Sequence, residues 1–230
     1  PADTRQAAAL PVGVRFGFLG EPESLEIDYR TETNDLGYRG SGAGTQFVLF
    51  RGSRSGDAAD AQLGEGSVRL RVGKGSEAAT LYLPEGMRPT VFALRPEGGE
   101  IRLAPEQPRW LCYGDSIAEG WCASEPAAAW AHVVSRERNL DVVNLGYAGV
   151  ARGEVASAQE IASLEADLIS VPYGTNCCTR PHLRSALFAA PPYAFSVIVR
   201  QCHPEHPNFP ICPILRTAAW TPHTPVGAPG

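Results

Sequence analysis

Residues 110–121 read WLCYGDSIAEGW, an apolar run that leads directly into Gly-Asp-Ser and then into a helix-like segment. Residues 109–113 predict a buried strand, so Ser116 lies at the turn that joins this strand to a helix. After Trp110, apolar runs continue to alternate with segments of helical period. This βαβ rhythm predicts an α/β fold with a mostly parallel sheet and helices on both faces.

The expected elements of this second half follow from the same patterns. Ser124 is the expected N-cap of the first long helix, with Pro126 tolerated in its first turn. Segment 184–207 resembles a helix, but we expect a break at Pro191 and Pro192 because each proline removes a backbone donor. Strands are expected over 109–113, 140–147, 167–176 and 209–216, and helices over 124–139 and 153–166.

The first half has a different pattern of apolar residues. Between Val14 and Leu103, short apolar alternations are broken by Gly-rich turns, which predicts an antiparallel β-sandwich. Residues 95–110 then concentrate Pro and Gly, as a boundary between domains commonly does. We therefore expect a β-sandwich domain over 1–105 and an α/β domain over 106–230.

The composition and charge of the chain limit the kinds of molecule that it is expected to bind. The chain has 230 residues, 43% of them apolar and 20% charged, which is ordinary for a globular protein. A net charge of −5 without a basic stripe argues against nucleic acid, and no apolar run approaches the ~20 residues of a membrane span. Residues 1–13 show no signal-peptide pattern and no initiating Met. We therefore expect a chain processed or incomplete at its N-terminus, with a cytoplasmic location as the default.

No cofactor or metal is expected from the cysteines and their spacing. The six cysteines all lie in the second half and include no C-x-x-C pair. Buried or incidental thiols are the expected interpretation. The adjacent pair Cys177 and Cys178 is expected to be two neighbours in a loop at a strand end rather than a disulfide.

Three successive strand ends carry residues that acyl transfer requires. Ser116 supplies a hydroxyl at the first turn, together with a backbone N–H. Gly149, in NLGYAG, allows a backbone N–H to approach a ligand, and Asn176, in YGTN, supplies an amide donor. Each residue alone is most often structural, as a cap or turn former. Together they would form an oxyanion hole if they point at one place.

The blocks YGDSIAEG, NLGYAG and YGTN resemble those of the SGNH (GDSL) hydrolases. The resemblance covers roughly 110–226 and implies a flavodoxin-like domain that cleaves ester bonds, with Ser116 as nucleophile and Gly149 and Asn176 in the oxyanion hole. The usual third block is Gly-x-Asn-Asp, whereas Cys177 follows Asn176 here.

The preceding β-sandwich is similar to the N-terminal domain of two-domain members, some of which are carbohydrate acetylesterases. The expected partner is therefore a small-molecule or carbohydrate ester. The Gly-x-Ser-x-Gly elbow is absent, because Arg54 occupies the serine position of GSRSG. VGKGS around Lys74 lacks the spacing of a phosphate-binding loop.

The expected catalytic base is missing from the sequence. In this superfamily it is the His of an Asp-x-x-His block near the C-terminus. No such block occurs, and the last aspartate is Asp167. We therefore expect the catalytic pair to lie outside these 230 residues, as in a truncated or frame-disturbed hydrolase.

The histidines present do not replace it. His132 lies in the first helix, where surface or packing roles are commoner than catalysis. His182 is a candidate for substrate contact, in a loop near Asn176. His203 and His206 are expected in the connection before the fourth strand, at the far edge from the site. The remaining histidine is His223, in the terminal tail.

Two other functions remain open. The chain can be a non-catalytic carbohydrate-binding protein, with Tyr29, Tyr38 and Phe47 as candidate aromatic contacts, although core packing is the commoner role for each. It can also be an inactive truncated hydrolase fragment. In that case limited proteolysis would remove the region after Trp110 first.

Overall fold

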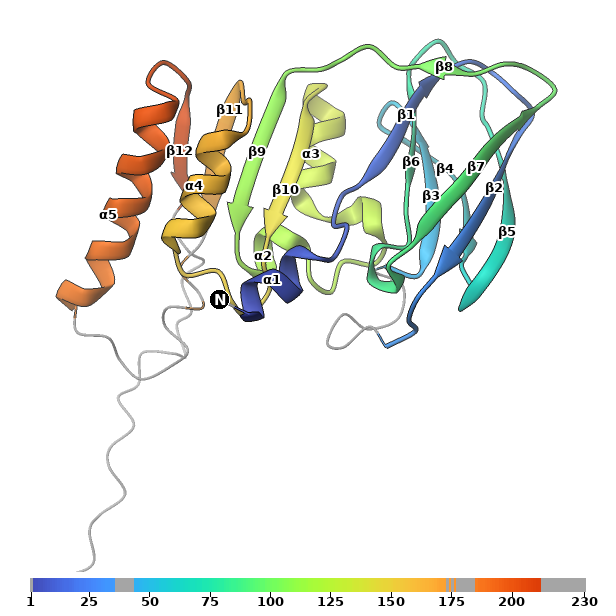
Figure 1. The fold of residues 1–230 in the computed structure, drawn as a ribbon. Coiled ribbons are helices and arrows are strands. Elements are labelled where there is room, and N and C mark those ends of the chain that lie inside the picture. The colour runs from blue at the N-terminus through green and yellow to red at the C-terminus, as the bar shows by residue number, and fades with distance from the viewer. Residues whose placement is uncertain (1, 36–43, 173, 175, 177–184, 212–230) are drawn as a thin grey trace, which may run out of the picture.

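The computed structural model describes residues 2–35, 44–172, 174, 176 and 185–211. A β half leads through a linker into an α/β half, and the two lie side by side (Figure 1). A short helix, α1 (Ala2–Ala8), precedes the β half, yet Ala7 packs against the core of the α/β half.

The β half contains two antiparallel sheets, in the orders β4-β3-β6-β1-β8 and β5-β2-β7. The antiparallel character expected from the sequence is confirmed. The strand bounds are β1 (Arg15–Leu19), β2 (Ser24–Thr31), β3 (Gln46–Arg51), β4 (Arg54–Asp60), β5 (Gly64–Arg71), β6 (Ala79–Tyr82), β7 (Thr90–Glu97) and β8 (Arg102–Leu103), with a 3-10 turn η2 (Glu85–Met87) before β7.

One core lies between these two sheets. The inward positions of β2, which alternate along the strand, include Ile27 and Tyr29, and β3 contributes Phe47 and Leu49. Tyr29 and Phe47 are 2% and 0% exposed, so they are core residues rather than a carbohydrate-binding platform. Tyr38 lies outside the described residues.

The sequence analysis did not anticipate β4. Its residues, RSGDAAD, offer almost no apolar alternation, yet they pair with β3 from Gln46 opposite Asp60 to Arg51 opposite Arg54, with one shift of register between Val48 and Phe50. The GSRSG segment is thus the hairpin turn between β3 and β4 and the start of β4. Gly52 has a φ of +56° there, a conformation that favours glycine.

The α/β half contains a four-stranded sheet in the order β10-β9-β11-β12, and all its pairs are parallel. The predicted parallel sheet is therefore confirmed. Its elements are β9 (Arg109–Gly114), α2 (Ser116–Glu119), η3 (Pro126–Ala128), α3 (Trp130–Arg138), β10 (Asp141–Gly146), α4 (Val155–Ser163), β11 (Leu168–Pro172), α5 (Ser185–Cys202) and β12 (Asn208–Ile211).

Strand β9 shows why both faces of this sheet are covered. Leu111 and Tyr113 enter the core beneath α4 and α5, whereas Trp110 and Cys112 enter the core beneath α3 (Figure 1). This two-sided burial explains the continuous apolar run WLCY. The chain passes from β9 to β10 on one side and then to β11 on the other, so the order reverses beside β9. Ligand sites in doubly wound sheets lie at such a point.

Two expectations about helices were wrong. Ser124 does not cap the first helix: a 3-10 turn at Pro126–Ala128 comes first, and α3 begins only at Trp130. Helix α5 runs unbroken through Pro191 and Pro192. Tertiary packing overrides the local penalty, because Phe195 and Val199 of this helix are buried against α4 and the sheet. No helix within the described residues has the length and apolar character to cross a membrane.

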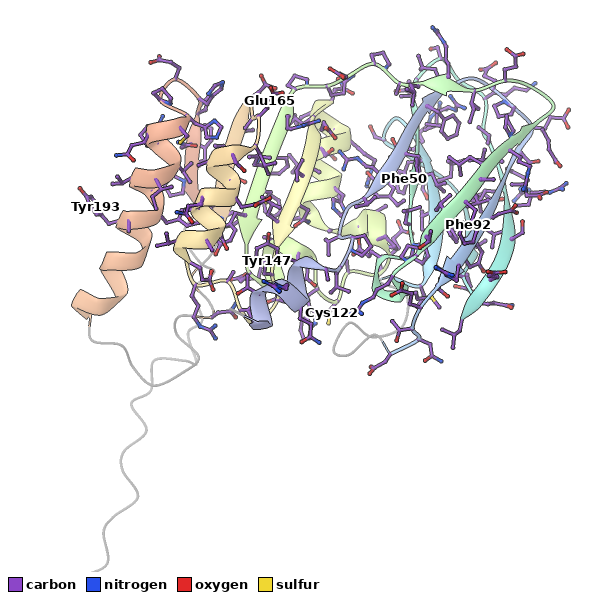
Figure 2. The ribbon with its side chains drawn as sticks, viewed as in Figure 1. Phe50, Phe92, Cys122, Tyr147, Glu165 and Tyr193 are labelled. Carbon is purple, nitrogen blue, oxygen red and sulfur yellow. The ribbon has the colours of Figure 1, made fainter. Side chains whose placement is uncertain are left out.

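Arg136 of α3 joins the two halves. Its guanidinium donates to Tyr82 Oη at 3.0 Å and to the Ala127 carbonyl at 2.8 Å. It also lies over the ring of Phe50, 3.9 Å from the ring centroid, and Phe50 is labelled in the β half in Figure 2. Arg15 makes a second link, because it donates to Asp141 at 2.6 Å and to the Val142 carbonyl at 2.8 Å.

Replacing Arg136 with Ala is expected to lower the free energy of unfolding by about 2 to 4 kcal/mol, because it removes a cation–π contact and two charged hydrogen bonds. Arg138→Ala is the matched control, because Arg138 lies two positions further along the same helix and is exposed. It should change stability by no more than about 0.5 kcal/mol. Urea denaturation measures both. Equal effects of the two substitutions would contradict this role for Arg136.

Candidate functional site

Ser116 is the first residue of α2, immediately beyond the end of β9. Asp115 caps this short helix: it is 1% exposed, and its Oδ1 accepts from the Ile117 N–H at 3.0 Å. Gly114 is required just before it, since a Cβ there would lie 2.2 Å from the Pro172 carbonyl oxygen and 2.5 Å from the Ala118 Cβ. The tight turn leaves Ser116 half-buried at the carboxyl end of the sheet.

Gly149 lies in the turn after β10. The Tyr147 N–H donates to the Gly114 carbonyl at 2.8 Å, so this turn is tied directly to the one that carries Ser116. Gly149 itself is exposed, and its φ of +75° is in the left-handed region that favours glycine. Tyr147 lies at the same end of the sheet as α1 (Figure 2).

Asn176 follows β11, the strand on the other side of β9. It is 7% exposed, and its Nδ2 donates to the Ala151 carbonyl at 3.4 Å. The side chain therefore reaches the turn after β10. The structure thus places Ser116, Gly149 and Asn176 at the carboxyl ends of three adjacent strands, as the three blocks predict.

A buried tyrosine supports the far side of the turn after β10. Tyr113 Oη donates to Glu154 Oε2 at 2.8 Å and accepts from the Gly153 N–H at 3.1 Å. Burial, together with the nearby Glu154 carboxylate, raises the pKa of Tyr113 far above its usual value, so the phenol remains a donor. Sequence reasoning missed this pair, because a tyrosine in a buried strand resembles an ordinary core residue.

Asn144 of β10 links the turn after β9, which carries Ser116, to the turn after β10, which carries Gly149. Its Nδ2 donates to the Ala118 carbonyl, and its Oδ1 accepts from the Gly146 N–H, both at 2.9 Å. Its Nδ2 also lies 3.4 Å from His132 Nε2. His132 Nδ1 lies 2.7 Å from the Pro126 carbonyl oxygen, which can only accept, so Nδ1 carries the proton.

His132 is therefore a packing residue, as expected. It is 0% exposed, and burial lowers its pKa to about 4 although the Pro126 hydrogen bond opposes the shift. A neutral, enclosed imidazole of this kind has a structural role beneath the site and cannot reach a substrate.

This burial predicts a pH-dependent stability. The folded pKa of about 4 lies below the ordinary value of 6.5, so the stabilisation is complete above pH 6.5 and is lost as the pH falls toward 4. Between pH 7 and pH 5 the loss should be about 2 kcal/mol. Urea titrations at the two pH values measure the free energy of unfolding. In His132→Phe this free energy should fall by about 2 kcal/mol less between pH 7 and pH 5 than in the parent protein. The other histidines are present in both the parent protein and the His132→Phe variant, so their contributions to the pH dependence cancel in the comparison. Parallel declines would contradict the argument.

The other predicted residues lie elsewhere. His203 and His206 occupy the connection between α5 and β12, as expected, and His203 is buried with Nε2 3.2 Å from the Ile161 carbonyl oxygen. His182, His223, Cys177 and Cys178 lie outside the described residues. Burial raises the pKa of the Cys112 thiol to about 12, so this cysteine is inert. No group of three or more metal-ligating side chains occurs in the part of the chain that the structure describes.

A polar cleft of about 1000 Å³ lies between the two halves. Its walls include Arg109, Asp141 and Asp167, which stand at the amino ends of β9, β10 and β11. None of the described residues that line it belongs to the three strand-end blocks. The cleft is therefore at the opposite end of the parallel strands from Ser116, and the candidate chemistry lies at the carboxyl end.

Comparison with known proteins finds a family for the same half of the chain. Residues 108–217 match the model of a family described as the GDSL-like lipase/acylhydrolase family. No curated protein matches the chain.

Three solved structures have a similar fold. A protein from Bacteroides ovatus described as a GDSL-like lipase is 20% identical with a TM-score of 0.77, over 91% of this chain and 64% of that one. A salicylyl-acyltransferase from a tetracycline biosynthetic pathway is 22% identical with a TM-score of 0.74, over 90% and 60%. A family two carbohydrate esterase from Clostridium thermocellum, in complex with cellohexaose, is 12% identical with a TM-score of 0.64, over 89% and 72%. The chain thus spans less than two thirds of the length of the first two.

Proposed function

We propose that the α/β half hydrolyses carboxylic esters with Ser116 as its nucleophile, because residues 108–217 match the model of the GDSL-like lipase/acylhydrolase family. The observation that carries the proposal is the convergence of Ser116, Gly149 and Asn176 at the carboxyl ends of three adjacent parallel strands. Sequence family and strand-end geometry thus indicate the same edge of the same sheet.

In the proposed reaction, Ser116 Oγ attacks the acyl carbonyl carbon and forms a new C–O bond as its proton passes to a base. The carbonyl oxygen becomes an oxyanion, which the N–H groups of Ser116 and Gly149 and the amide of Asn176 stabilise. The intermediate collapses, the alcohol leaves with a proton, and water then releases the acid from Ser116 by the reverse steps.

The base is the part of this mechanism that the described residues do not supply. His132 is enclosed and protonated on Nδ1 toward Pro126, and His203 and His206 lie beyond α5 at the β12 edge. We propose that the base is the His of an Asp-x-x-His block outside the 230 residues, because the sequence contains no such block.

For the substrate, we propose an acyl group on a carbohydrate, with acetyl as the first to test. Support comes from the likeness in fold to a carbohydrate esterase whose structure holds cellohexaose. We further propose that residues 1–105 and 106–230 are separate domains, joined by the contacts of Arg15 and Arg136. The acylated sugar, whose hydroxyl leaves as the alcohol, would approach the carboxyl ends of β9, β10 and β11.

A substrate series tests the activity and the acyl preference together. Release of p-nitrophenol from acetyl, butyryl and octanoyl esters, and of acetate from acetylated xylan, is measured with a form of the protein that includes an Asp-x-x-His block. Ser116→Ala is the control. Hydrolysis that survives in Ser116→Ala would refute the nucleophile, and a preference for octanoyl esters would refute the acetyl proposal.

A further inference from the structure

Glu119 is a buried acid beside the candidate site to which the mechanism above gives no role. It is the last residue of α2, three positions after Ser116, and is 1% exposed. Its Oε2 accepts a hydrogen bond from the Ala148 N–H at 2.6 Å. Ala148 immediately precedes Gly149, so the two turns that carry the candidate groups are joined by this carboxylate.

The backbone brings these two turns into direct contact. A Cβ on Gly146 would lie 2.2 Å from the Glu119 backbone nitrogen and 2.4 Å from its Cα, so the end of α2 rests on the end of β10. A carboxyl oxygen in such a place is costly to bury unless it is hydrogen-bonded. A short bond to a backbone N–H meets that requirement and also fixes the orientation of the peptide that supplies it.

The peptide unit that carries the Gly149 N–H lies between two peptide units that hydrogen bonds hold in place. On one side, the Ala148 N–H is bound by Glu119, and the Tyr147 carbonyl accepts from the N–H groups of Val150 at 3.3 Å and Ala151 at 3.2 Å. On the other side, the Arg152 guanidinium donates to the carbonyls of Gly149 and Val150, each at 3.2 Å. A glycine has wide conformational freedom, so its neighbours must restrict the direction of its N–H.

We propose that Glu119 is a positioning residue that holds the 146–150 turn in place through Ala148, so that the Gly149 N–H keeps the orientation required of an oxyanion donor. The proposal rests on the proposed function, in which Gly149 is such a donor. The carboxylate acts as a hydrogen-bond acceptor and takes no part in proton transfer.

Two substitutions of Glu119 with side chains of nearly equal volume distinguish the effect of its hydrogen-bond acceptor from the effect of its packing. Glu119→Gln keeps an acceptor oxygen, whereas Glu119→Met fills the same space without one. Glu85→Met is the matched control, because Glu85, in the β half, is also buried, at 5% exposed, and also accepts from a backbone N–H, that of Gly13 at 2.9 Å. Circular dichroism checks that each variant is folded.

The first measurement is amide hydrogen exchange on the 230-residue chain. In Glu119→Met we expect exchange to accelerate by about ten- to a hundredfold, the equivalent of one lost charged hydrogen bond, at Ala148 and Val150. The N–H of Ala148 donates to Glu119, and that of Val150 donates to the Tyr147 carbonyl within the same turn. Glu119→Gln should retain most of the protection, and Glu85→Met should leave both amides unchanged. Unchanged exchange at Val150 in Glu119→Met overturns the proposal. If the Met variant does not fold, loss of Val150 protection in Glu119→Gln overturns it instead.

The second measurement is turnover in a form that includes an Asp-x-x-His block. Glu119→Met should lower kcat by about tenfold or more with KM nearly unchanged, because an oxyanion donor acts in the transition state. Glu119→Gln should restore kcat; a Gln variant as slow as the Met variant would overturn the acceptor role. Exchange changes without any ester hydrolysis would refute the proposed function and leave the positioning role intact. Hydrolysis with undisturbed Val150 exchange in Glu119→Met would refute the positioning role and leave the proposed function intact.

Discussion

The 230-residue chain is expected to hydrolyse p-nitrophenyl acetate about a millionfold more slowly than a form that also includes an Asp-x-x-His block. A serine hydroxyl without its base is a poor nucleophile at neutral pH, and loss of the histidine from a triad costs on the order of a millionfold in turnover. Residual catalysis by the oxyanion hole and by binding remains in both forms. Labelling of Ser116 by a fluorophosphonate probe should rise in parallel with turnover.

The control for this experiment is Ser116→Ala in both forms. It should abolish turnover and labelling in the longer form and change almost nothing in the shorter one. Rapid hydrolysis by the 230-residue chain, lost in Ser116→Ala and in a variant of His182, His203, His206 or His223, would show that a base is already present. A longer form that remains inactive would count against the Asp-x-x-His assignment.

Replacing Asn176 with Ala should lower kcat of the longer form by about a hundredfold to a thousandfold, the usual effect of removing one oxyanion donor. The hydrogen bond that Asn176 Nδ2 donates to the Ala151 carbonyl is long, at 3.4 Å, so we expect its loss to leave the fold intact. Steady-state kinetics and thermal melting measure the two effects separately.

The matched substitution is Cys177→Ala, next in the chain, which should cost less than about tenfold because no chemical step is assigned to that thiol. Unchanged turnover in Asn176→Ala would make Asn176 a structural residue. A large loss of melting temperature in the same variant would lead to the same conclusion.

The sequence alone determined the sheet types and the edge that carries the candidate site. These features depend on local patterns: the alternation in segments such as SLEIDYR, the continuous apolar run WLCY, and a functional block directly after each of three strands. Strands in a parallel sheet end at the same edge, so the positions of Ser116, Gly149 and Asn176 follow once the strands are recognised. The positions of these three residues at one edge of the sheet were therefore predictable from spacing, whereas their chemical roles stay a prediction.

Long-range contacts decided what these patterns left open. Strand β4 forms because β3 offers it a partner, and α5 continues through Pro191 and Pro192 because its later turns are buried against α4 and the sheet. The carboxylate of Glu119 meets Ala148, far along the chain, only after α2 has packed on β10. Burial and hydrogen bonding between distant segments are properties of the assembled core, so only the tertiary structure determines them.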